Sequence, residues 1–88
     1  MKILLVGAGG VGDAIAKIAA RRDFFETMIV SDYDLSRAER TIAWITQRHG
    51  NHGARFVAAR IDASNPDSVA TVAREHGATH VMNAVEPK

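Results

Sequence analysis

The residues that set the architecture of this chain are Ile3-Leu4-Leu5-Val6-Gly7-Ala8-Gly9-Gly10-Val11-Gly12. They begin with an unbroken apolar run, which is typical of a parallel strand covered on both faces. The run leads into the pattern G-x-G-x-x-G, a loop that joins such a strand to a helix and holds a pyrophosphate. Gly7 permits the tight turn, Gly9 lets the backbone approach the phosphates, and Gly12 lets the helix pack closely on the sheet. The stretch predicts a dinucleotide-binding unit, and a plain tight turn between strand and helix is the alternative.

Apolar residues at helical spacing follow the glycines. They predict a helix whose buried stripe consists of Val11, Ala14, Ile15, Ile18 and Ala19. This helix should end near residues 21–23, because the cations Arg21 and Arg22 are favourable at the negative end of its dipole. The next apolar run, Thr27-Met28-Ile29-Val30, is predicted as the second strand, closed by Ser31-Asp32.

A second helix should follow that strand. Asp34 or Ser36 can cap it, and the spacing from Ser36 to Glu39 matches a capping box. Its predicted buried face consists of Leu35, Ala38, Ile42 and Ile45, and it should end around His49-Gly50. A weaker strand is expected at residues 56–59, where the flanking Arg55 and Arg60 suit a position at the edge of a sheet.

The remaining part of the chain predicts one more helix and one more strand. Asn65-Pro66-Asp67 places an N-cap, a proline at the first helical position and an acid in the first turn. Gly77 is expected to end this helix, and Thr79-His80-Val81-Met82 is the fourth predicted strand. The order strand-helix-strand-helix-strand-helix-strand predicts an α/β fold with one parallel, Rossmann-like sheet in the order 3-2-1-4 and helices on both faces.

We expect residues 1–88 to form a single domain, the N-terminal fragment of a longer protein. Strands five and six of the full dinucleotide-binding fold are not predicted in this sequence. The fourth strand should therefore be an open edge, and pairing between copies of the chain through that edge is expected.

Composition excludes several classes of protein. Of the 88 residues 47% are hydrophobic and 24% are charged, which is an ordinary globular mix rather than a disordered one. A net charge of +1 gives no basis for nucleic-acid binding, and no apolar run is long enough to span a membrane. Cysteine is absent, which excludes disulfides and thiolate metal sites and suits a cytoplasmic location.

Asp32 is the second strong functional signal. It lies 20 positions after Gly12, where an acid accepts hydrogen bonds from the adenosine ribose and favours NAD over NADP. The alternative is a role in capping the second helix or as a solvated loop acid. Arg37 can reach the adenine or a 2′-phosphate, or lie solvated on the first turn of that helix.

The other candidate residues carry weaker signals. Asp62 can bond the adenine amino group or cap the turn before the third helix, and Asn83-Ala84 follows the fourth strand, either as part of the ligand crevice or as a simple turn. Asp13 is expected to form a surface pair with Lys17. Two histidines at 49 and 52 are a poor metal set, and no catalytic constellation is found, so no catalytic and no metal-binding residue is predicted.

The chain resembles the N-terminal NAD(P)-binding domain of the saccharopine dehydrogenase-like family. The resemblance lies in the residues 1–12, Ser31-Asp32-Tyr33-Asp34, Ile61-Asp62-Ala63, and Val81-Met82-Asn83-Ala84 with the nearby Pro87. It implies an oxidoreductase that joins or splits an amino acid and a keto acid or aldehyde through an imine, with a substrate domain that follows later in the chain. The cofactor, NAD with NADP as second choice, would then contact Gly7, Ala8, Gly9, Gly10, Val11, Gly12, Asp32, Asp62, Ala63, Asn83 and Ala84.

A binding module is the alternative to an enzyme. Regulatory nucleotide-binding domains of potassium channels and transporters resemble the chain in the glycine loop, the acid after the second strand and the Asn-Pro-Asp context. In such a domain the nucleotide shifts a conformational equilibrium and is not consumed. The Asn83-Ala84 ending fits these domains less well, and a dinucleotide enzyme of another family is a third interpretation.

Overall fold

A computed structural model describes residues 1–85, apart from the side chains of residues 51 and 52. Pro87, which belongs to the stretch that resembles the family, lies outside the described residues. In chain order the elements are β1 (Lys2–Val6), α1 (Gly10–Ala19), β2 (Thr27–Asp32), α2 (Leu35–His49), the 3₁₀ helix η1 (Gly50–Arg55), β3 (Phe56–Arg60), α3 (Pro66–His76) and β4 (His80–Asn83).

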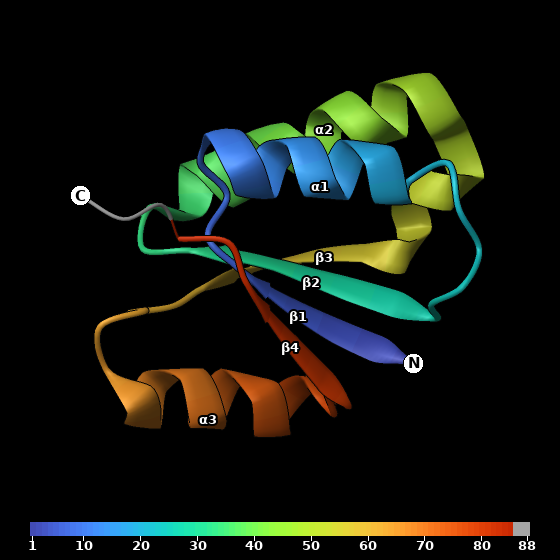
Figure 1. The fold of residues 1–88 in the computed structure, drawn as a ribbon. Helices are drawn as coiled ribbons and strands as arrows, with labels where there is room; N and C mark the ends of the chain where they lie inside the picture. Colours follow the sequence, from blue (N-terminus) through green and yellow to red (C-terminus); the bar gives the residue numbers. More distant parts are fainter. Residues whose placement is uncertain (86–88) are drawn as a thin grey trace.

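The strands form one parallel sheet with the predicted order. Within residues 1–85 the sheet has four strands in the order β3-β2-β1-β4. In its register Leu4 of β1 lies between Ile29 of β2 and Val81 of β4. Figure 1 shows α1 and α2 on one side of the sheet and α3 on the other. The doubly wound α/β architecture is therefore confirmed.

Each face of the sheet has its own apolar core. Ile3 and Leu5 point to the side of α1 and α2, whereas Leu4 and Val6 point to the side of α3. This alternation is the period of two that a strand imposes, and both faces are apolar because helices cover both. The continuous apolar run in β1 is explained by this double burial.

Helix α1 is turned differently from the prediction. Val11 is 48% exposed and Ile18 is 61% exposed, so both were wrongly placed in the buried stripe, as was the exposed Ala14. Ala19 is buried as predicted, together with Gly12 and Ala16, while Ile15 is half-buried. Small residues on the inner face allow the helix axis to approach the sheet, which leaves the larger side chains on the outside.

The two charged side chains of α1 face α2. The Asp13 carboxylate accepts a hydrogen bond of 2.6 Å from Thr41 and pairs with Lys17 at 2.7 Å, which confirms the predicted i,i+4 pair. Lys17 also lies 4.6 Å from the ring centroid of Trp44. Burial acts to raise the pKa of Asp13, but the hydrogen bonds from Lys17 and Thr41 and the charge of Lys17 outweigh it and lower that pKa. Polar contacts thus join α1 to α2.

The ends of α2 and α3 follow the sequence closely. Asp34 caps α2 by accepting a 3.0 Å hydrogen bond from the Ser36 N–H. The prediction of a capping box from Ser36 to Glu39 is wrong, because Ser36 lies inside the helix and not at its N-cap, and its hydroxyl donates a hydrogen bond to Asp34. The buried face of α2 also differs, since Leu35 is 38% exposed and Thr41 is buried. Asn65 caps α3 as predicted.

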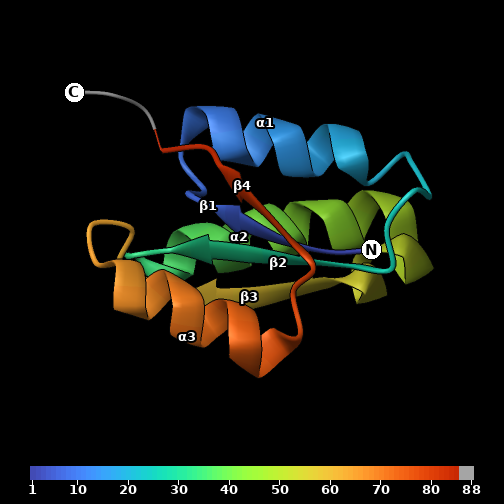
Figure 2. The same ribbon diagram turned by 60° about the horizontal axis from the view of Figure 1, so that its bottom comes forward.

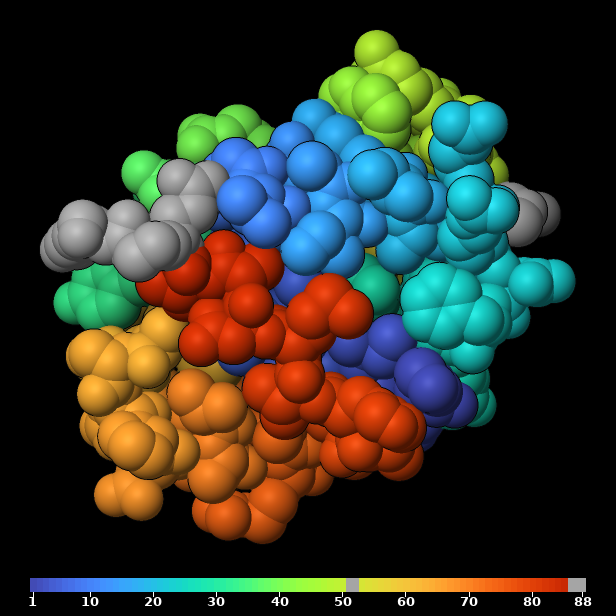
Figure 3. Space-filling model, viewed as in Figure 1, coloured from blue at the N-terminus to red at the C-terminus, as the bar shows by residue number. Residues whose placement is uncertain are grey.

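The two edges of the sheet differ in character. At the β3 edge, Arg55, which precedes the strand, stacks over Phe25, and Arg60, its last residue, stacks over Tyr33. All four residues of β4 are exposed, and within residues 1–85 this strand pairs with β1 alone. Figure 2 shows β4 passing between α1 and α3, and Figure 3 shows it exposed below α1. Within the described residues β4 is therefore an edge of the sheet, as predicted. Among the described residues no helix is long and apolar enough to cross a membrane.

Candidate functional site

Gly7 turns the chain out of β1 toward α1. Its φ of 102° lies in the region that side chains rarely adopt. Its N–H donates to the Ser31 carbonyl oxygen at 2.8 Å, and a Cβ at this position would come within 3.2 Å of the Ala84 backbone. The first glycine of the motif is therefore required by the backbone itself.

The other two glycines of the motif have opposite surroundings. A Cβ on Gly12 would overlap the carbonyl oxygen of Gly7 and lie 2.7 Å from its carbonyl carbon. A Cβ on Gly9 would meet nothing within 4 Å. Gly12 is thus needed for the helix to sit against the strand. Gly9 is not needed by the fold, and the open space above it is what a ligand that approaches the backbone requires.

Helix α1 presents its N-terminus at this open space. Gly9 is its N-cap and has no side chain with which to cap the first turn, and Gly10 is exposed. The positive end of the helix dipole and the N–H groups of a first turn favour an anion. The geometry suits a pyrophosphate laid along Gly9 and Gly10.

Asp32 ties two loops together at the end of β2. One carboxylate oxygen accepts from the Ala8 N–H at 2.8 Å, and the other accepts from the Asp34 N–H at 2.9 Å. Its carboxylate is therefore fixed in place. Because a carboxylate has about four lone-pair sites, it retains capacity to accept from ribose hydroxyls. The cap of α2 is Asp34, so the alternative role of Asp32 as that cap is not seen.

Two cavities adjoin the glycine loop. The first, of about 370 Å³, lies beside Asp32 and is lined by Gly7, Asp32, Tyr33, Arg37, Ile61, Ala63 and Val85. The second, of about 290 Å³, lies between α1 and α2 and is lined by Ala8, Gly9, Gly10, Asp13, Arg37, Arg40 and Thr41. Arg37 lines both, so the two cavities meet at this side chain.

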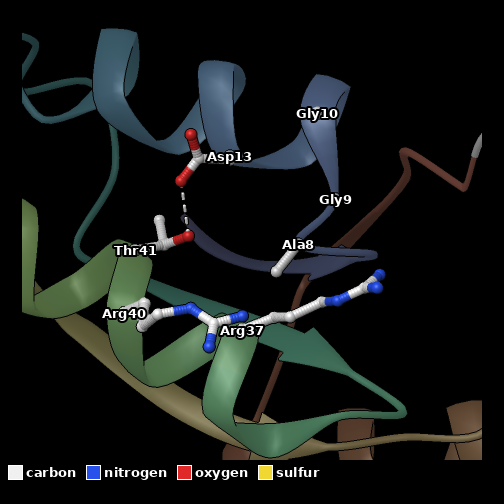
Figure 4. A pocket seen from close by; sticks show the side chains of 7 residues that line it. All are labelled: Ala8, Gly9, Gly10, Asp13, Arg37, Arg40 and Thr41. Atoms are coloured by element: carbon white, nitrogen blue, oxygen red, sulfur yellow. Dashed lines mark hydrogen bonds between the residues drawn. The ribbon is translucent and has the colours of Figure 1, made fainter.

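Two cations dominate the cavity between α1 and α2. Figure 4 shows Arg37 extending past Ala8 and Gly9, with Arg40 beside it on the same helix. Arg37 was a candidate from the sequence, whereas Arg40, Thr41 and Tyr33 were not predicted as site residues. The spacing of three residues between the arginines was an available signal, because it places both on one face of a helix.

The remaining predicted residues are spread over the crevice. Ala63 lines the first cavity, whereas Asp62 lines a third cavity of about 320 Å³. Hydrogen bonds from the Ser64 hydroxyl and backbone N–H lower the pKa of Asp62 and engage one of its oxygens. Asn83 accepts from the Val85 N–H at 2.9 Å in a turn, and Ala84 is buried beside Gly7. Within the described residues no cluster of side chains is placed to hold a metal ion.

Comparisons with known proteins agree with the fold. The family model for the saccharopine dehydrogenase NADP binding domain matches residues 3–87. Menthone neomenthol reductase from Mentha piperita is similar with a TM-score of 0.79 and 20% identity, over 98% of this chain and 31% of that one. Quinate dehydrogenase from Corynebacterium glutamicum, solved in complex with NAD, is similar with a TM-score of 0.62 and 28% identity, over 96% of this chain and 26% of that one. The chain thus spans less than a third of either structure.

Proposed function

Since the chain belongs to the saccharopine dehydrogenase NADP binding domain family, we propose that it is the cofactor-binding part of an oxidoreductase acting on an amino-acid or imine substrate. A bound dinucleotide would supply or accept a hydride at its nicotinamide ring. No catalytic residue is assigned to this chain, and a further substrate domain is proposed to provide that chemistry. The cysteine-free sequence also supports the prediction of a cytoplasmic location.

The open space over Gly9 is the observation that carries the proposal. The fold tolerates a side chain there, yet the position is glycine and lies at the N-terminus of α1. We place the pyrophosphate at Gly9 and Gly10, and the adenosine in the cavity beside Asp32. The family match favours this enzyme over a regulatory domain in which the nucleotide is only a signal.

We propose NAD as the preferred cofactor. The fixed carboxylate of Asp32 can accept from both ribose hydroxyls, whereas it would repel a 2′-phosphate. Arg37 and Arg40 act in the opposite direction, because both can pair with a phosphate. Arg37 borders the same cavity, but the Asp32 carboxylate is fixed there by two hydrogen bonds, and for this reason we expect the carboxylate to prevail.

Calorimetric titration of NAD and NADP tests this preference. A hydrogen bond to a charged group contributes about 1.5–3 kcal/mol, so we expect NAD to bind roughly 10- to 150-fold more tightly. Asp32→Asn should reduce the difference between the NAD and NADP affinities. The control Asp23→Asn, which removes an exposed carboxylate from the loop after α1, should leave that difference unchanged. If NADP binds as tightly as NAD and Arg37→Gln abolishes the binding of NADP, the proposed preference for NAD is wrong, but the proposed location of the cofactor is not contradicted.

The exposed β4 edge is proposed to associate with another polypeptide. Val81 is 54% exposed, Met82 is 38% exposed, and β4 carries no acidic residue, lysine or arginine. An edge without such protection pairs readily with another strand. In the purified chain the available partner is a second copy, and in a longer protein it would be a further strand.

Analytical ultracentrifugation of the 88-residue chain tests the edge. We expect concentration-dependent self-association that the Val81→Lys variant abolishes, because a charge on an edge strand opposes pairing. Val57→Lys is the matched control, since Val57 is 39% exposed on the opposite edge strand. A wild-type chain that stays monomeric at high concentration would contradict the proposed association through β4.

We also expect that the 88-residue chain does not turn over any amino-acid substrate.

A further inference from the structure

Tyr33 occupies an unusual position for an aromatic residue. It follows β2 directly, beside Asp32, and is 65% exposed. The guanidinium of Arg60 lies 4.8 Å from the centroid of its ring. Arg60 also donates from Nε to the Tyr33 carbonyl oxygen at 3.2 Å, which fixes the cation relative to the backbone that carries the ring. A large, exposed ring is thus held in place by a cation and not by core packing.

Tyr33 borders two neighbouring cavities. Tyr33 lines both the adenosine cavity of about 370 Å³ and the neighbouring cavity of about 320 Å³. Arg60 lines only the second. Arg60 thus lies on the side of the second cavity, whereas Tyr33 also borders the cavity that contains Asp32 and Gly7.

We propose that Tyr33 is the platform on which the adenine base of the dinucleotide stacks, with Arg60 supporting the ring from behind. This inference rests on the proposed function, because it assumes that the adenosine enters the cavity beside Asp32. An exposed ring gains contact area by stacking on a base, and the gain is large because the ring is already positioned. The cation attracts the π-electrons of the ring toward one face. The opposite face is then less negative, which favours stacking of an electron-rich base on it.

Ligands with and without an adenine base distinguish binding at Tyr33 from binding at the glycine loop. Inorganic pyrophosphate, AMP and NAD are titrated calorimetrically into the 88-residue chain and its variants. Base–aromatic stacking predicts that Tyr33→Ala weakens AMP and NAD by about 5- to 150-fold. Pyrophosphate should be unaffected, since Tyr33 does not line the cavity at Gly9 and Gly10. Tyr33→Phe should keep most of the affinity, and Arg60→Met should cause a smaller loss.

Controls and spectroscopy make the test decisive. Phe24→Ala removes another exposed aromatic ring, 55% exposed in the loop before β2, and should leave every affinity unchanged. Tyr33 is the only tyrosine of the chain, so its ring protons are identified in NMR spectra without ambiguity. AMP and NAD should shift these signals, and pyrophosphate should not. If NAD binds but leaves the Tyr33 signals unshifted, and Tyr33→Ala binds NAD as tightly as the wild-type chain, then the stacking role of Tyr33 is wrong and the proposed function still stands. Failure of the wild-type chain to bind NAD would overturn the proposed function and the platform with it.

Discussion

Replacing Gly12 by alanine is expected to remove most of the native stability of this chain. The added Cβ would overlap the Gly7 carbonyl oxygen and lie 2.7 Å from the carbonyl carbon. Both atoms belong to backbone that cannot rotate away, so α1 would have to leave the sheet. Overpacking typically costs about 1–3 kcal/mol, and more where backbone must move. A chain of this size has little stability in reserve.

Urea unfolding followed by circular dichroism measures the effect. Gly9→Ala is the matched control, because its Cβ would meet nothing within 4 Å and the same methyl group is added three residues away. The control should unfold at the wild-type midpoint. A Gly12→Ala variant with the same midpoint would mean that the strand and α1 separate more easily than the structure indicates.

Gly9→Val is expected to abolish dinucleotide binding while leaving the fold intact. The Gly9 backbone is extended, with φ of −74° and ψ of −163°, which a branched residue adopts readily. The side chain would occupy the space that we assign to the pyrophosphate. Losing two hydrogen bonds to a charged group, each worth about 1.5–3 kcal/mol, weakens binding by about 100-fold or more.

Calorimetry with NAD, alongside circular dichroism, separates binding from folding for this variant. Ala14→Val adds comparable bulk on the exposed side of α1 and should bind NAD normally. Equal NAD affinity in Gly9→Val and in the wild-type chain would show that the pyrophosphate lies elsewhere. Loss of secondary structure in Gly9→Val would contradict the open space that surrounds this position.

Much of the fold is determined by local patterns in this sequence. The glycine loop, the Asn65-Pro66-Asp67 helix start and the apolar runs predict the elements, and right-handed crossovers then fix the strand order. Helix α1 was oriented wrongly because its apolar residues exceed what one face can bury. The contacts of Asp13 with Thr41 and of Lys17 with Trp44 join α1 to α2 over a long distance in sequence, and the spacing within α1 does not encode them.

The candidate site was predictable only in its central part. Gly7, Gly9, Gly12 and Asp32 belong to a spacing that carries its own physical reason. Arg40 and Tyr33 join the site because α2 and the β2–α2 loop pack beside the glycine loop. The spacing of Arg40 from Arg37 was a local signal for Arg40, whereas no local pattern indicates Tyr33. Asn83 accepts a hydrogen bond within a local turn, which is the alternative that the sequence left open for it.

The two hydrogen bonds of Asp32 restrict how cofactor preference can change in evolution or by engineering. The residue that we propose to select the ribose also accepts hydrogen bonds from the Ala8 and Asp34 backbone N–H groups. A small apolar substitute that admits a 2′-phosphate would leave both N–H groups without their acceptor, one of them only partly exposed to water. Switching the cofactor is therefore not a one-residue exchange in this chain. The incoming side chain must be uncharged yet still accept two hydrogen bonds, or the loops must be redesigned together.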